Sequence, residues 1–359
     1  MNIQESLRMT SVQNPVNSVP TVISTVYGAI GHVELNRPEK LNALTLEMLT
    51  ELDRVLKVWA EDSSIQLVLL TGRGERGFCA GGDIADFHQA ITTGKHQDFI
   101  NLLSSEFDLD YLISTYPKPL ITLAHGITMG GGVGLASHAP VRLVTASAKM
   151  GMPEAKIGYT PDVGGSHLLA NAPGYLGEYF AMSAASFCGA DAVFMGFADV
   201  VVTDAFAENI LDELDELLGL SPAEIISAIE VLHGAPESFA LQQTQGWVDH
   251  AFSAQTPQEV IERLEQMVHP AAGQAAQLLA ANSPSSICAA FYSVREARAE
   301  QDLRSALNRE LRLASFLMHQ PDLAEGIRAQ VIDKDRNPHW SPALLADVFQ
   351  DELRSLVRE

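Results

Sequence analysis

One segment with little other charge, residues 152–165 (MPEAKIGYTPDVGG), carries two carboxylates eight residues apart. Glu154 and Asp162 each follow a proline directly and are framed by apolar residues and glycines. A carboxylate held near apolar groups has a raised pKa and can serve as base, acid or nucleophile. Either residue alone is better explained as a solvated loop acid. The pair indicates a reaction only if other features of the chain place a substrate beside it.

Two glycine-rich segments precede the carboxylates and could supply that placement. They are residues 80–83 (AGGD) and residues 125–134 (HGITMGGGVG). Glycine has no Cβ, so backbone amides can approach a ligand, and a glycine run that opens a helix aims unpaired N–H groups at negative charge. Two such amides converging on one point form an oxyanion hole for an enolate or a tetrahedral intermediate. Tight turns with close helix packing are the competing explanation.

Other chemical motifs are weak. Residues 72–77 (GRGERG) fit the pattern G-x-G-x-x-G, but a dinucleotide site needs a helix that opens at the third glycine, whereas residues 78–83 continue as a loop. There is no G-x-S-x-G elbow, and the adjacent Ser137-His138 and Ser166-His167 pairs are poorly placed for a hydrogen-bonded dyad. No cluster has metal-ligand spacing, so we expect neither a metal nor a nucleotide cofactor.

The elements that must position these residues are those of a mixed α/β core. Apolar alternation predicts a strand pair over residues 22–35. Leucines at spacings of three and four, with Thr45 as N-cap, predict a helix over residues 46–59. Three short apolar runs predict further buried strands, at residues 65–71, 120–123 and 141–145. Strands that alternate with helices favour an α/β fold.

After residue 204 the pattern changes to long amphipathic helices, such as residues 205–218 and 256–282. We therefore expect a catalytic core over residues 21–204 and a helical C-terminal region over residues 205–359. Residues 1–20 have no apolar signal core, which predicts a disordered leader.

Composition narrows the classes of partner. Lysine and arginine total 23 against 45 aspartates and glutamates, and the net charge of −22 repels nucleic acid and anionic membranes. The sequence contains no run of about 18 consecutive apolar residues, so it predicts no membrane-spanning helix. The three cysteines are odd in number and widely spaced, which argues against a disulfide framework and fits a reducing, cytoplasmic location.

The three segments in this order resemble the crotonase, or enoyl-CoA hydratase/isomerase, superfamily. The pattern is an A-G-G-D loop, then H-G-x-x-x-G-G-G, then P-E-x-x-x-G-x-x-P-x-x-G-G. The resemblance implies a ClpP-like spiral of ββα repeats with a helical C-terminal trimerisation region, and hence a possible homo-oligomer. It implies that the backbone amides of Ala80 and Gly131 form the oxyanion hole around an acyl-CoA thioester carbonyl. Coenzyme A would then be part of the substrate, with no separate cofactor.

Within that superfamily the chain is most similar to the 3-hydroxyisobutyryl-CoA hydrolases. Hydratases carry a second catalytic glutamate at the position of Gly134, whereas this branch has an aspartate where the chain has Asp162. The branch also has a substrate-pocket glutamate that matches Glu106. Glu154 and Asp162 would then catalyse hydrolysis of a short-chain acyl-CoA thioester of valine catabolism. The alternatives are an enoyl-CoA hydratase or isomerase and a non-catalytic acyl-CoA-binding subunit.

The same resemblance gives expectations for substrate binding. Gly82, Asp83 and Gly130, beside the two amides, are expected to contact the substrate together with Glu106. The chain departs from the branch near the acyl pocket, where Tyr159-Thr160 stands in place of a frequent Leu-Phe pair. Three basic residues near the core loops are candidates for the nucleotide phosphates: Arg37, Lys40 and Lys118.

Overall fold

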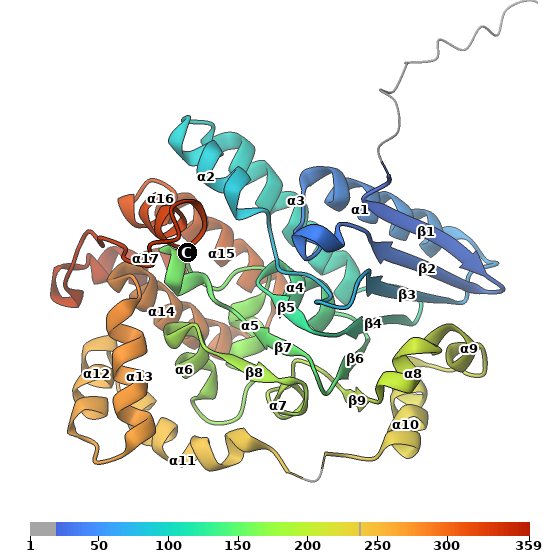
Figure 1. The fold of residues 1–359 in the computed structure, drawn as a ribbon. Coiled ribbons are helices and arrows are strands. Elements are labelled where there is room, and N and C mark those ends of the chain that lie inside the picture. The colour runs from blue at the N-terminus through green and yellow to red at the C-terminus, as the bar shows by residue number, and fades with distance from the viewer. Residues whose placement is uncertain (1–18, 237) are drawn as a thin grey trace, which may run out of the picture.

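The computed structural model of the chain describes residues 19–236 and 238–359 (Figure 1). The leader predicted over residues 1–20 therefore lies outside the described residues, except for its last two positions.

A six-stranded sheet contains all of the predicted strands and one further strand, β9, that was not predicted. Its order is β1-β2-β3-β4-β6-β9; β1 and β2 pair antiparallel, and the other neighbours run parallel. The central strand β4 is buried along its whole length, as expected for a strand covered on both faces. The predicted strands are confirmed, although the third begins two residues later than expected. The strands are β1 (Val22–Tyr27), β2 (Ile30–Leu35), β3 (Leu67–Gly72), β4 (Leu120–Ala124), β6 (Val141–Thr145) and β9 (Val200–Val202).

A second sheet of three short strands has no counterpart in the sequence prediction. It consists of β5 (Ile127–Met129), β7 (Lys149–Gly151) and β8 (Ser186–Cys188), with β5 parallel to β7 and β8 antiparallel to β7. Cys79 extends this sheet by one parallel bridge to Thr128. Strands of three residues are too short for a periodic pattern, which is why the sequence did not reveal them.

The chain moves repeatedly from the large sheet to the small one and then into a helix. β4 and β5 are followed by α4 (Gly131–Ser137), and β6 and β7 by the 3₁₀ helix η2 (Glu154–Ile157). β3, the Cys79 bridge and α2 (Ile84–Thr92) repeat the same order. These repeats confirm the predicted ββα spiral.

Helix α1 (Leu46–Glu61) shows why the sequence prediction succeeds for long elements. Thr45 accepts a hydrogen bond from the Met48 amide and caps the helix as expected. One face is buried, from Met48 to Trp59, at helical spacing. The other core helices are α3 (His96–Ser114), α5 (Gly165–Ala170), α6 (Leu176–Ser183) and α7 (Gly189–Phe194).

The described elements after β9 are all helical, but two predicted long helices are each divided. Residues 205–218 form α8 (Asp204–Glu208) and α9 (Ile210–Asp215). Residues 256–282 form α12 (Pro257–Gln266) and α13 (Pro270–Ala281), because Pro270 cannot continue a helix but can begin one. The remaining helices are α10 (Pro222–His233), α11 (Ala240–Phe252), α14 (Pro284–Glu300), α15 (Leu303–Leu317), α16 (Pro321–Ile327) and α17 (Gln350–Arg358).

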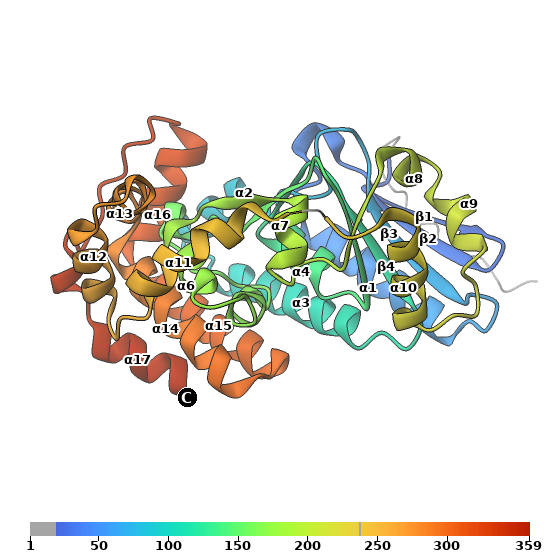
Figure 2. The same cartoon turned by 90° about the horizontal axis from the view of Figure 1, so that it is seen from below.

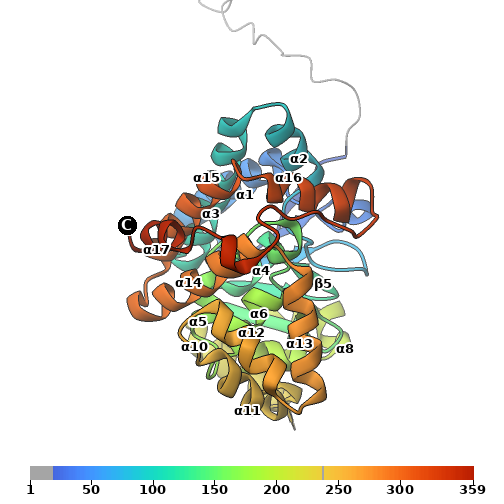
Figure 3. The ribbon, with the colours of Figure 1, turned by 90° about the vertical axis from the view of Figure 1, so that its left-hand side faces the viewer.

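Helices α12 to α17 gather at one end of the molecule, whereas α8, α9 and α10 lie beside the large sheet at the other end (Figure 2). One hydrophobic cluster nevertheless runs from Val22 to Val357 and includes α14, which is buried without interruption from Pro284 to Val294. Helix α16 packs against both α2 and η2, so the C-terminal region covers the ends of the repeats (Figure 3). Within the described ranges, no helix combines the length and apolarity that crossing a bilayer would require.

Candidate active site

The small sheet aligns three loops along one edge. Cys79 bridges Thr128, and Met129 on β5 pairs with Gly151 on β7, in each case in parallel. The carboxyl ends of parallel strands lie at the same edge of a sheet. The ends of these strands therefore place three segments side by side: residues 80–82, 130–131 and 152–154. The two glycine-rich segments thus lie next to Glu154, the first of the two carboxylates.

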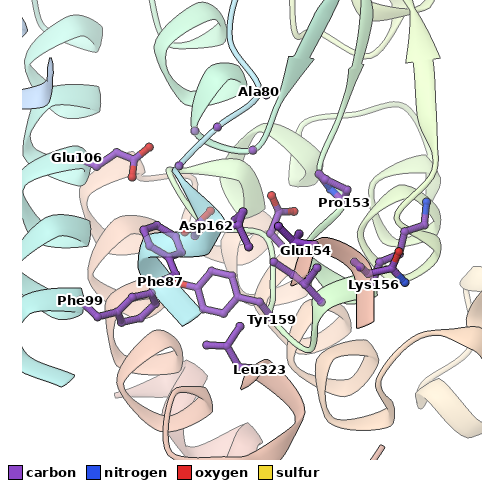
Figure 4. Close-up of a pocket in the computed structure, with 18 residues that line it drawn as sticks. Ala80, Phe87, Phe99, Glu106, Pro153, Glu154, Lys156, Tyr159, Asp162 and Leu323 are labelled. Atoms are coloured by element: carbon purple, nitrogen blue, oxygen red, sulfur yellow. The ribbon is translucent and has the colours of Figure 1, made fainter. Parts of the chain in front are cut away.

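These loops bound a cavity of about 270 Å³. Phe87, Phe99 and Leu323 form apolar walls, while the carboxyl groups of Glu106, Glu154 and Asp162 lie at the end nearest the loop at Ala80 (Figure 4). The cavity is lined by Ala80, Gly81, Gly82, Ile84, Phe87, Phe99, Glu106, Gly130, Gly131, Pro153, Glu154, Lys156, Ile157, Tyr159, Asp162, Leu323, Gln330 and Val331.

The two predicted oxyanion donors differ in their present partners. The Gly131 amide is in the first turn of α4 and has no acceptor among the described residues. The Ala80 amide instead donates to the carbonyl of Leu41 at 2.9 Å. A substrate oxygen would have to share or replace that acceptor, whereas the Gly131 donor is already available.

Two glycines are required here because carboxylates lie directly over them. A Cβ on Gly131 would stand 2.0 Å from Oε1 of Glu106, and a Cβ on Gly130 would stand 3.0 Å from Oε1 of Glu154. Glu106 projects from α3 and Glu154 begins η2, so the carboxyl groups reach the glycine loop from different elements. Any side chain at position 131 would displace Glu106 from the cavity.

Burial raises the pKa of both candidate catalytic carboxyl groups, those of Glu154 and Asp162. Loss of hydration, reinforced by the negative charges of Glu310 and Glu106, raises the pKa of Glu154 to about 8. The pKa of Asp162 is also raised well above its usual value, first by burial and then by the charge of Glu154. Burial therefore favours the protonated form of each group, and when Glu154 is ionised its charge disfavours ionisation of Asp162.

Glu310, on α15, was not predicted as a site residue, yet it anchors the loop that carries Asp162. Its carboxylate accepts hydrogen bonds from the amide of Gly164 at 2.7 Å, the amide of Ser166 at 2.9 Å and the hydroxyl of Ser166 at 2.6 Å. These bonds oppose the effect of burial, which still raises its pKa to about 7. Its partners lie about 145 residues earlier, so no local pattern in the sequence pointed to it.

Asp110, on α3, occupies the space beside Gly134. A Cβ on Gly134 would meet the two Asp110 carboxyl oxygens at 2.9 and 3.0 Å and Val163 at 2.8 Å. Asp110 is fully buried, and neither oxygen has a hydrogen-bond partner among the described residues. Burial and the charges of Glu106, Asp162 and Glu310 raise its pKa well above the usual value. The structure therefore has no room for a larger residue at position 134.

Several other predicted residues lie elsewhere or have structural roles. Gly82 lines the cavity, whereas Asp83 is outside the set of lining residues and pairs with Arg37 at 3.3 Å. Lys118 donates to the carbonyls of Trp59 and Asp62 at the end of α1, which argues against its assignment to phosphate binding.

The two Ser-His pairs form no dyad. His138 Nε2 bonds the Val163 carbonyl at 2.8 Å, and the Ser166 hydroxyl donates to Glu310. These partners agree with the expectation that neither pair supplies an activated serine.

Comparison with known proteins gives matches along nearly the whole chain. A family model described as enoyl-CoA hydratase/isomerase matches residues 30–357. The chain is similar to 3-hydroxyisobutyryl-CoA hydrolase, mitochondrial, of Danio rerio, with 37% identity over 92% of this chain and 88% of the relative. The relative of the same name from Homo sapiens is 34% identical over 91% and 86%. The crystal structure of a carnitinyl-CoA dehydratase from Mycobacterium thermoresistibile is 38% identical, with a TM-score of 0.87 over 94% of this chain and 96% of that one.

Proposed function

Because the chain belongs to the enoyl-CoA hydratase/isomerase family, we propose that it is an acyl-CoA thioester hydrolase whose substrate is 3-hydroxyisobutyryl-CoA. The observation that carries the proposal is one cavity containing the Gly131 amide, Glu154 and Asp162. The names of the curated relatives support the choice of substrate, and with it a place in valine catabolism. A cytoplasmic location stays a prediction, since the vertebrate relatives are named as mitochondrial.

In the proposed mechanism the thioester carbonyl oxygen accepts a hydrogen bond from the Gly131 amide. The Ala80 amide can donate a second hydrogen bond to the same oxygen if it gives up its bond to the Leu41 carbonyl. The Glu154 carboxylate attacks the carbonyl carbon, the carbon–sulfur bond breaks, and a mixed anhydride forms. Asp162 gives its proton to the departing CoA thiolate. It then takes a proton from the water that hydrolyses the anhydride, which releases the free acid and restores Glu154. Direct activation of water by Glu154 is the alternative, and single-turnover labelling in heavy-oxygen water separates the two.

A hydratase is the second candidate, favoured by the name of the solved dehydratase structure. Addition of water to a double bond ordinarily uses two positioned carboxylates, one of them at the position of Gly134. Here Asp110 and Val163 fill the space that a side chain at that position would need. A purely acyl-CoA-binding role is disfavoured because it gives no reason to bury Glu154 and Asp162 together.

Release of free thiol from 3-hydroxyisobutyryl-CoA tests the proposal, with crotonyl-CoA as the hydratase substrate. We expect thiol release, and we expect Glu154→Gln and Asp162→Asn each to lower turnover by at least about 100-fold with the fold intact. Glu178→Gln is a matched control, because Glu178 is also a buried glutamate but lies outside the cavity and pairs with Arg298 at 3.0 Å. Loss of crotonyl-CoA absorbance without thiol release would identify a hydratase instead.

A further inference from the structure

Tyr159 brings a polar group into the cavity that the proposed mechanism does not use. The residue is 4% exposed and lines the cavity, and its hydroxyl makes no well-formed hydrogen bond among the described residues, although the Asp162 carboxyl lies near it. A buried hydroxyl without a partner is costly, whereas one that gains a partner from a ligand contributes to binding. Tyr159 is also a position at which the chain differs from the 3-hydroxyisobutyryl-CoA hydrolases, which frequently have leucine there.

The surroundings of Tyr159 limit what that ligand group can be. In Figure 4 its ring lies between Phe87 and Leu323, with Asp162 at the carboxyl end of the cavity. Phe99 meets the ring edge-on, with centroids 6.4 Å apart. The walls around the ring are therefore apolar and suit the carbon atoms of a short acyl chain, whereas the Asp162 carboxyl lies near the hydroxyl.

The charges around the cavity exclude one class of acyl group. Burial raises the pKa of Tyr159, and the nearby charges of Asp162, Glu310 and Glu154 raise it further. Glu106 and Glu154 each have one buried oxygen without a partner in the described part of the chain. An acyl chain ending in a carboxylate would meet these acids and be repelled. A neutral hydroxyl can donate to a carboxylate and accept from Tyr159 at the same time.

We propose that Tyr159 is a specificity-determining residue whose hydroxyl donates to a neutral hydroxyl on the acyl chain of the substrate, with Glu106 accepting from that same group. The inference rests on the proposed hydrolase function for the identity of the acyl chain. It assigns to this cavity short acyl thioesters with a hydroxyl at C3, in preference to the same chains without it. A site built to pair with a hydroxyl rejects the deoxy analogue because its own polar groups then stay unpaired.

The test compares Tyr159→Phe with the unmodified protein on 3-hydroxyisobutyryl-CoA and isobutyryl-CoA. We expect the ratio of the two kcat/KM values to fall by about 10-fold or more in the variant. Tyr116→Phe is the matched control, since the Tyr116 hydroxyl is buried but already bonds the Leu56 carbonyl at 2.7 Å. That variant should keep the ratio. An equal loss on both substrates in Tyr159→Phe would overturn the proposal and indicate that Tyr159 positions Asp162 instead.

A binding measurement separates this inference from the hydrolase proposal. Thioether analogues of the two acyl-CoA esters cannot be hydrolysed, and calorimetry gives their affinities for both proteins directly. If the unmodified protein prefers the hydroxylated analogue and Tyr159→Phe abolishes that preference, the inference holds even if no thiol is released from the esters. If the unmodified protein binds both analogues equally, the inference fails whatever the reaction is.

Discussion

At the scale of single residues, the site depends on carboxyl groups held where water cannot stabilise their charge. Glu154 is the clearest case, because burial raises its pKa from 4.5 to about 8. Its folded-state pKa lies above the unfolded value, so protonated Glu154 favours the folded chain. That contribution is complete below about pH 4.5 and is lost as the pH rises towards 8.

We therefore expect Glu154→Gln to be more stable than the unmodified protein at pH 8 to 9, by a few kcal/mol. The amide keeps the shape of the side chain and cannot ionise. Thermal unfolding of both proteins across pH 4 to 9 measures the effect, and the difference should shrink towards acidic pH. A constant difference at every pH would mean that ionisation of Glu154 is not its cause.

Position 134 gives a prediction about steric exclusion. Gly134→Glu should lower the unfolding temperature, because its side chain would overlap the Asp110 carboxyl group and Val163. Overpacking of this kind costs about 1–3 kcal/mol, and a second buried carboxylate adds to it.

The control for this prediction is Asp110→Ala in combination with Gly134→Glu. Removal of the Asp110 carboxyl should recover part of the stability that Gly134→Glu removes, so the two changes should be coupled in a double-mutant cycle. Additive effects would show that Asp110 does not limit what position 134 can hold.

At the scale of elements, α15 supports the loop of Asp162 from the C-terminal region. We expect Glu310→Ala to lower kcat more than it changes KM, because the amides of Gly164 and Ser166 lose their acceptor and Asp162 loses its fixed position. Glu310→Gln retains an acceptor oxygen and should restore part of the rate. Steady-state kinetics of both variants check this, and equal kcat in Glu310→Ala and the unmodified protein would contradict it.

The elements that could be predicted from the sequence are those with a complete local signal. Helix α1 has its cap and its apolar face within one continuous segment, and β4 is a short run that is apolar except for Thr122. The small sheet has strands of three residues, and Glu310 and Asp110 act on partners far along the chain. Motif order located Glu154, Asp162 and Gly131, whereas only the folded chain shows that the Ala80 amide has an acceptor.

At the scale of the whole molecule, the predicted boundary near residue 204 separates strands from helices but does not separate two cores. The last described strand ends at Val202, yet one hydrophobic cluster continues into α14 and α17. Leu323, Gln330 and Val331 from the C-terminal region line the cavity. The chain thus covers its own candidate active site, and the predicted homo-oligomer stays a prediction.

We therefore expect a chain ended at residue 204 to lack cooperative folding. Removal of α14 would expose to water the α5 and α6 surfaces against which it packs, and exposure of each buried leucine or phenylalanine side chain costs about 1.5–3 kcal/mol. Urea unfolding followed by circular dichroism measures this. A sharp unfolding transition in the shortened chain would establish residues 21–204 as an independent domain.

The buried carboxyl groups have a further consequence when they are considered as one titrating system. Glu106, Asp110, Glu154, Asp162 and Glu310 are all buried, and the charges of Glu106 and Glu310 raise the pKa of the other three. Their protons are therefore shared, and a charge change at one group redistributes them among the others. In the proposed mechanism, the proton taken up by the departing CoA thiolate then comes from Asp162, one of these buried groups. These carboxyl groups then need to exchange protons with solvent only after the products have left.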